Sequence, residues 1–222
     1  MTKRVISVFL CVLCVISSIS FIVSAKENKE YTSDNFLSVA DGIIAWKKAD
    51  NGSEPDGYLI NDKYLENAGT TPGDWYPIAL GRLGIQDNNE GYLAVIKDRV
   101  EERYRESGRL SAAKATEWHR IALAVLAMGG DPTNFGTDEN GAPINLIADG
   151  TYDRGKTTPL GRQGINGWIW GLITLDSMRY AVPDGAYNTR DDIIVEIISK
   201  QLSDGGFALS SDDADPDITA MA

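Results

Sequence analysis

The chain has 222 residues, of which 43% are hydrophobic and 24% are charged, and its formal net charge is −11. This acidic balance repels phosphate backbones and leaves no basic footprint for nucleic acid, so cations or neutral ligands fit better as partners. The length and hydrophobic content suffice for one sizeable core, which excludes an intrinsically disordered tail.

Residues 1–25 have the pattern of a secretory signal peptide. Lys3 and Arg4 precede an apolar run from residue 5 to residue 23, and small residues suited to cleavage follow it. We therefore expect a secreted or cell-surface protein with a short linker at 26–33, and contact with the membrane only if the signal stays uncleaved. An uncleaved anchor is the alternative, because the apolar run is close to membrane-spanning length.

Both cysteines, Cys11 and Cys14, lie inside that apolar run. Cleavage would leave a mature chain with no thiol for a disulfide or a thiolate metal ligand. It would also remove two basic residues and no acidic one, which changes the formal net charge from −11 to −13.

Residues 34–222 contain a series of segments with helical periodicity, and we expect an all-α domain. The predicted helices span 34–48, 74–83, 88–106, 112–128, 165–180 and 190–202. Gly84 is expected to end the second of these, Asn88 or Asn89 to cap the third, and Thr189 to cap the last. Segments rich in Gly, Asn and Pro at 49–73 and 131–163 are predicted to be mainly irregular, with a short helix at 145–149. The 88–106 helix is charged on one side, as in an outer layer, whereas 112–128 and 165–180 have the apolar pattern of inner helices.

A weak internal repeat begins at Asp74, Glu117, Asn166 and Asp217, with separations of 43, 49 and 51 residues. This spacing suits one helical hairpin per repeat. Each copy begins with a residue that can satisfy the unpaired N–H groups of a helix N-terminus, so we expect all four residues to be caps. Copies in register would also place these N-termini at one rim of the domain.

The last 22 residues contain a turn motif followed by the start of a helix. Residues 201–207 read Gln-Leu-Ser-Asp-Gly-Gly-Phe, and residues 215–222 read Asp-Pro-Asp-Ile-Thr-Ala-Met-Ala. Together they resemble the repeat of the prenyltransferase and squalene-cyclase (squalene-oxidase) family, found in terpenoid cyclases, protein prenyltransferase β-subunits and transcobalamin-like carriers. The resemblance implies an α/α toroid of helical hairpins. Residues 34–222 supply only three to four hairpins, which predicts a fragment truncated inside its last helix.

The resemblance also implies a candidate catalytic acid. Class II terpene cyclases use a D-x-D-D-T-A motif whose middle Asp protonates an alkene, and residues 215–220 resemble it, with Asp215 first and Asp217 at the acid's position. Ile218 replaces the last Asp of the motif. Neighbouring groups adjust the acidity of such an acid, so this loss weakens the assignment. The alternative is that Asp217 caps a helix.

Metal sites have little support in the sequence. Asp213, Asp215 and Asp217 alternate as in the first half of a calcium loop, but the turn Gly and the distal Glu of such a loop are absent. The zinc site of protein prenyltransferases uses an Asp, a Cys and a His, and the mature chain offers His119 alone, which we expect to be a rim or packing residue. We expect no cofactor.

Five aromatic residues lie near the starts of the predicted inner helices: Trp75, Tyr76, Trp118, Trp168 and Trp170. In the cyclases that the repeat resembles, aromatic faces line the barrel and stabilise carbocations through the ring quadrupole. Ordinary core and rim packing is one interpretation of these residues. A ligand-binding mouth lined by their rings is the other.

The scaffold is therefore predicted while its familiar catalytic sets are absent or altered. We expect a non-catalytic secreted or cell-surface module that binds a small molecule or a surface partner. One alternative is a terpene cyclase of the squalene-hopene type with Asp217 as general acid. A second alternative, also implied by the resemblance, is a corrinoid carrier similar to transcobalamin.

Overall fold

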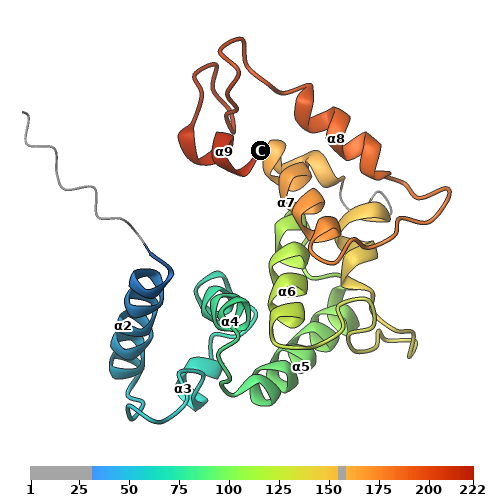
Figure 1. Cartoon of the computed structure of the whole chain (residues 1–222). Coiled ribbons are helices and arrows are strands. Elements are labelled where there is room, and N and C mark those ends of the chain that lie inside the picture. The colour runs from blue at the N-terminus through green and yellow to red at the C-terminus, as the bar shows by residue number, and fades with distance from the viewer. Residues whose placement is uncertain (1–31, 155–158) are drawn as a thin grey trace, which may run out of the picture. The chain divides into compact units, whose positions relative to one another are not determined.

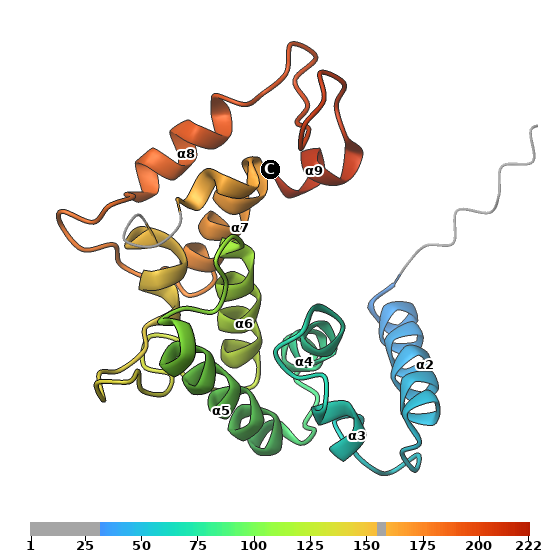
Figure 2. The same ribbon diagram turned by 180° about the vertical axis from the view of Figure 1, so that it is seen from behind.

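The computed structural model describes residues 32–154 and 159–222, and all regular elements within these ranges are helical (Figures 1 and 2). In this part of the chain, extended pairing is limited to an isolated antiparallel bridge between Thr137 and Pro143. The predicted all-α class is therefore confirmed. The predicted signal peptide and residues 26–31 of the predicted linker lie outside the described residues.

Most of the helices occur where the periodicity predicts them, with different ends. They are α2 (Ser33–Asn51), α3 (Asp62–Leu65), α4 (Thr71–Leu83), α5 (Asn89–Ser107), α6 (Ala115–Ala127), the π-helical turn η1 (Ala148–Tyr152), the 3₁₀ turn η3 (Leu160–Gln163), α7 (Ile165–Asp176), α8 (Arg190–Ile198) and α9 (Pro216–Met221). The irregular prediction for 49–73 was wrong for the end of α2, for α3 and for the first turn of α4, and that for 131–163 was wrong for η3. Pro72 at the second helical position of α4 is the local signal for the earlier start of this helix. The short helix predicted at 145–149 is found a few residues later, as η1.

The chain divides into two compact units, residues 1–45 and 46–222. The described part of the first unit consists almost entirely of the N-terminal portion of α2. Helices α3 to α9 belong to the second unit. The site and the packing below concern this second unit.

Helix α4 tolerates a proline in its interior because a neighbouring side chain replaces the lost hydrogen bond. Pro77 has no N–H, so the carbonyl of Gly73, four residues earlier, lacks its usual helical donor. The hydroxyl of Tyr64 in α3 donates to that carbonyl oxygen at 3.0 Å. A Cβ at Gly73 would lie 1.8 Å from the carbonyl oxygen of Asn67, so glycine permits this close approach.

Helix α6 packs between α4 and α7 (Figures 1 and 2). Gly81 lets α4 approach closely, because a Cβ there would lie 2.1 Å from the carbonyl oxygen of Ala127. Along α6, Ile121, Ala122 and Val125 are buried, as expected for an inner helix. The predicted inner segments 117–128 and 166–178 therefore lie side by side, which is the packing that the repeat requires.

A buried aromatic cluster joins α5, α6 and η1. The indole Nε1–H of Trp118 donates to the hydroxyl oxygen of Tyr104 at 2.8 Å, and that hydroxyl donates to Asp149 Oδ2 at 2.7 Å. The guanidinium of Arg154 lies 4.0 Å from the centroid of the Trp118 ring. Burial lowers the pKa of Arg154 to about 10, although the nearby Tyr104 and Asp149 act in the opposite direction.

The C-terminal turn motif has a clear structural role. The N–H of Leu202 donates to the carbonyl of Gly206, and the N–H of Phe207 donates to the hydroxyl of Thr219 in α9 at 2.9 Å. A Cβ at Gly206 would lie 2.5 Å from the Cβ of Ala214, so this position favours glycine. The Gly-Gly turn is thereby attached to the first turns of α9.

Local capping explains the ends of several helices. The side chain of Asn88 caps α5 by accepting from the N–H of Gly91, and Gly84 ends α4 in the left-handed conformation. Thr189 and Asp192 form a reciprocal capping box at the start of α8. These caps agree with the sequence prediction.

Candidate ligand-binding pocket

A pocket of about 190 Å³ lies at the N-terminal ends of the three packed helices, and we call it the rim pocket. Its lining comes from the first turns of α4, α6 and α7, from the 3₁₀ turn before α7, and from one residue in the second turn of each of these three helices. The lining residues are Thr71, Trp75, Thr116, Arg120, Gln163, Asn166 and Trp170. The predicted convergence of these helix N-termini is therefore confirmed for α4, α6 and α7.

Two of the five predicted aromatic residues meet in this pocket. The ring centroids of Trp75 and Trp170 lie 5.7 Å apart with an interplanar angle of 54°. Trp75 is 42% exposed, so its ring is accessible to a ligand. The pair presents a continuous apolar surface at the pocket wall.

The other three aromatic residues lie outside the lining. Trp118 is fully buried in the core, and Trp168 packs against Gly161, where a Cβ would lie 2.6 Å from the indole Nε1. Tyr76 meets Tyr64 edge-on, with 6.4 Å between ring centroids. Packing therefore accounts for these three residues, which is the first of the two interpretations that the sequence allowed.

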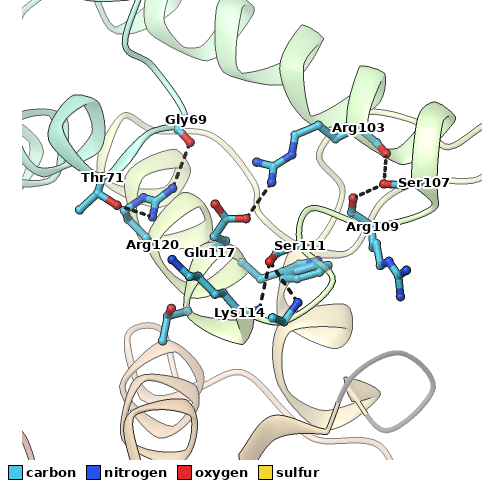
Figure 3. A network of polar contacts seen from close by, with 12 residues as sticks. Gly69, Thr71, Arg103, Ser107, Arg109, Ser111, Lys114, Glu117 and Arg120 are labelled. Atoms are coloured by element: carbon cyan, nitrogen blue, oxygen red, sulfur yellow. Dashed lines mark hydrogen bonds and ion pairs between the residues drawn. The ribbon is translucent and has the colours of Figure 1, made fainter. Parts of the chain in front are cut away.

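Arg120 forms one side of the rim pocket and is held by three protein groups. Its Nε donates to Asp74 Oδ2 at 2.8 Å, and its terminal nitrogens donate to Thr71 Oγ1 at 3.2 Å and to the carbonyl of Gly69 at 3.0 Å. Figure 3 shows the guanidinium directed at Gly69 and Thr71. A guanidinium has five N–H donors, so these contacts leave donors for a ligand.

The Asp74 carboxylate is fully buried behind Arg120. Besides Arg120, it accepts from the hydroxyl of Tyr92 at 2.8 Å and from the N–H of Gly69 at 2.7 Å. Burial raises the pKa of Asp74, while the hydrogen bonds from Arg120, Tyr92 and Gly69 oppose that rise. Burial and the neighbouring Asp74 also raise the pKa of Tyr92. These groups fix the Arg120 side chain in place.

Gln163 caps α6 from a distance. Its Oε1 accepts from the backbone N–H of Thr116 at 3.1 Å and lies 3.2 Å from the Thr116 hydroxyl, while its Nε2 lies 3.1 Å from the same hydroxyl. Lys114, at the N-cap position of α6, forms no side-chain capping bond. A residue 47 positions away therefore satisfies this helix end.

Asn166 supplies the least satisfied polar group of the pocket. Its Oδ1 is buried and has no hydrogen-bond partner among the described residues. A buried acceptor without a donor costs free energy, so such atoms are uncommon in folded proteins. This oxygen is enclosed by protein atoms, so the part of Asn166 that lines the pocket is the remainder of its side chain.

The prediction that Asp74, Glu117, Asn166 and Asp217 are N-caps was wrong. Each of them instead lies within the first four residues of its helix. Asp74 is the fourth residue of α4, and Asn166 is the second residue of α7. Glu117 is the third residue of α6 and pairs with Arg103 at 2.7 Å, as Figure 3 shows. Asp217 is the second residue of α9.

Asp215 is the cap of α9. Its Oδ1 accepts from the N–H groups of Asp217 and Ile218 at 2.8 and 2.9 Å. Pro216 occupies the first helical position, where proline is favoured, and this shifts the cap two residues earlier than predicted. Both Asp215 and Asp217 are exposed.

A hollow beside these acids has no aromatic residue in its lining. It is lined by Asp204, Gly205, Gly206, Ala214, Pro216, Thr219 and Ala220. Within residues 32–154 and 159–222, no group of three His, Cys, Asp or Glu side chains is arranged to hold a metal ion. Asp213, Asp215 and Asp217 thus form no such group.

His119 is a core residue. It is fully buried, and its Nε2 lies 2.7 Å from the carbonyl oxygen of Gly150, to which it donates. Burial lowers the pKa of His119 to about 3, so the ring is neutral near pH 7. This agrees with the expected packing role.

Sequence reasoning missed Arg120, Gln163, Thr71 and Thr116 as pocket residues. One signal was present for Arg120: a charged residue within an apolar helix is rarely buried unless it is paired, which indicates an acidic partner elsewhere. Gln163 and the two threonines lie in segments without a distinguishing pattern. Only the packing of the helices brings them together.

Within the described ranges, no helix combines the length and the apolar character that a membrane span requires.

No protein-family model matches the chain, and neither the curated proteins nor the solved structures include a match. The proposals below therefore depend on the residues and their geometry.

Proposed function

We propose that this chain is an exported, non-catalytic module of the α/α-toroid type that binds a small molecule in the rim pocket. The observation that carries the proposal is the meeting of Trp75 and Trp170 with Arg120 and Asn166 at the ends of three helices. Pockets that combine aromatic surface with a few fixed polar groups are the usual form of a ligand site.

The helix arrangement supports the toroid part of the proposal. Helices α4, α6 and α7 pack in sequence order and bring their N-terminal ends to one pocket, as the inner helices of a toroid would. Helix α5 contacts α6 through Tyr104 and Trp118, and α8 packs against α7, as outer helices would. The signal-like segment at 1–25 supports export.

The pocket chemistry favours binding over catalysis. The rim pocket, built from described residues, has no carboxylic acid, imidazole or thiol in its lining. These are the groups that most often transfer protons or act as nucleophiles. The exposure of Asp217 is also unlike the setting of an acid that protonates an alkene, which must exclude water.

A direct test uses the five indole N–H signals of the full chain in a proton–nitrogen NMR spectrum. The signals of Trp75 and Trp170 are assigned with the variants Trp75→Phe and Trp170→Phe. The chain is then titrated with neutral, anionic and cationic ring compounds at millimolar concentration. We expect at least one compound to shift both signals while the Trp46 signal stays unchanged, because Trp46 lies outside the pocket lining. If none of the three classes shifts the Trp75 and Trp170 signals, the proposed binding function is refuted.

A further inference from the structure

The charged side chain in the described lining of the rim pocket is already paired before any ligand enters. Among the described residues that line the pocket, Arg120 is the one that carries a charge, and its guanidinium is paired with the buried Asp74 carboxylate at 2.8 Å. The positive end of α6 is matched by the Gln163 carbonyl oxygen, and the start of α4 lies beside Asp74. Because Arg120 already has its counterion, no described side chain of the lining needs an ionic partner, and the site suits a neutral ligand.

The hydrogen-bonding groups of the pocket suit a ligand that accepts hydrogen bonds. The guanidinium of Arg120 has N–H groups left over from its three protein contacts, and these can donate to a ligand. The hydroxyl of Thr71 already accepts from Arg120 and can itself donate. A hydroxyl group offers one donor and two acceptor positions, so neighbouring hydroxyls on one ring can accept from these donors.

The apolar surface completes the pattern. Trp75 and Trp170 provide two adjoining ring faces, and the pocket volume of about 190 Å³ corresponds to roughly six liquid waters. This space suits one six-membered ring with its substituents. A saccharide ring presents C–H groups on one face, which pack on an aromatic ring, and hydroxyls around its edge.

We propose that the rim pocket binds a neutral, hydroxyl-bearing ring, namely a single sugar unit of a glycan. This inference rests on the proposed binding function and names its ligand class. The tryptophan pair holds the C–H face of the ring, while Asn166 and Arg120 hydrogen-bond to hydroxyls at its edge.

The test compares four ring compounds of similar size on the full chain. The neutral sugars are methyl β-D-glucopyranoside and the methyl glycoside of N-acetylglucosamine, and the charged controls are cyclohexanecarboxylate and cyclohexylammonium. We expect the Trp75 and Trp170 indole signals to respond to at least one sugar with a millimolar dissociation constant, because so small a ligand gains limited affinity. The two ions should bind at least tenfold more weakly.

Two variants separate a sugar site from a merely structural role. Trp75→Ala should weaken sugar binding at least tenfold, whereas Trp46→Ala, which removes an exposed tryptophan outside the lining, should leave it unchanged. Asn166→Ala should weaken binding about fivefold without lowering the melting temperature, because it removes a buried acceptor that has no partner in the free protein. Trp75→Leu is used if Trp75→Ala does not fold.

The outcomes distinguish the two proposals. If an ion shifts the Trp75 and Trp170 signals and neither sugar does, the ligand class is wrong and the binding function stands. If no compound shifts them, both proposals fail. Sugar binding that Trp75→Ala and Asn166→Ala leave unchanged would place the site elsewhere and overturn this inference.

Discussion

Asp74 and Arg120 lie 46 residues apart in the sequence, yet their side chains form a buried ion pair with 2.8 Å between Oδ2 and Nε. The Asp74 side chain is fully buried, and that of Arg120 is 10% exposed. Each residue of the pair therefore depends on the other for its electrostatic balance. The pair connects α4 to α6, and its Arg120 forms one side of the rim pocket.

Replacing Arg120 by methionine should strongly destabilise the fold. It leaves the Asp74 carboxylate buried without its cation, which typically costs about 3–5 kcal/mol. The double variant Asp74→Asn/Arg120→Met should lose less unfolding free energy than the sum of the losses in Asp74→Asn and in Arg120→Met. Urea unfolding of the three variants and the wild type at pH 7 measures this coupling, and strict additivity would contradict it.

The same variant should show a characteristic pH dependence. Burial raises the pKa of Asp74, and the loss of Arg120 removes an interaction that opposes this rise. An acid with a raised pKa in the folded state binds a proton more readily when folded, so it favours folding at low pH and disfavours it as pH increases. The loss of unfolding free energy caused by Arg120→Met should therefore be smaller near pH 4 than at pH 7. An equal or larger loss at the lower pH would contradict this expectation.

His119 should make the protein sensitive to acid. Its pKa is about 3 when folded, against an ordinary value of 6.5, so folding favours the neutral ring. The stability from this residue is fully present above pH 6.5 and is lost as pH falls toward 3, at about 1.4 kcal/mol per pH unit. The stability difference between wild type and His119→Gln should thus shrink by about 2 kcal/mol from pH 6.5 to 4.5. Parallel stability curves for the two proteins would refute this assignment.

Tyr104→Phe tests the buried cluster between α5 and α6. The change removes the oxygen that accepts from Trp118 Nε1 and the hydrogen that Asp149 accepts. The indole N–H then loses its partner inside the protein, which should cost about 1–3 kcal/mol. Chemical denaturation at neutral pH measures the loss. Tyr187→Phe removes a hydroxyl from an exposed residue and serves as the control, with little change expected.

Gln163→Ala tests the distant cap of α6. The variant removes the side-chain oxygen that accepts from the Thr116 N–H, and cap removal typically costs about 1 kcal/mol. Gln86→Ala is the matched control, because Gln86 is an exposed glutamine in a loop. Hydrogen exchange should show faster opening of the first turn of α6 in Gln163→Ala alone. Equal exchange in the two variants would show that Gln163 is not the cap.

Asp215 and Asp217 can be separated by their effects on α9. Asp215→Ala removes the acceptor for two N–H groups and should speed amide exchange at Asp217 and Ile218 about fivefold. Asp217→Ala leaves both capping bonds in place and should change exchange at Ile218 much less. A larger effect of Asp217→Ala would restore the sequence-based assignment of that residue as the cap.

The sequence by itself determined the helical class, most helix positions and the local caps at Asn88, Gly84 and Thr189. These features depend on side-chain periodicity and on contacts within one or two turns, which residue order specifies directly. Asp215 and Asp217 could each have capped α9. Pro216 favours the first helical position, so the helix begins there and Asp215 is the cap. Residue types also indicated that aromatic side chains gather near the helix starts.

Only the tertiary structure decided which of these residues form a site. It paired Asp74 with Arg120, placed Gln163 at the end of α6, and brought Trp75 of α4 against Trp170 of α7. In the tertiary structure Trp118 also lies in the core, and Asn166 Oδ1 is buried without a hydrogen-bond donor among the described residues. The physical reason is that these contacts join residues about 45 to 95 positions apart, and their partners are fixed by the packing of whole helices, which no local pattern specifies.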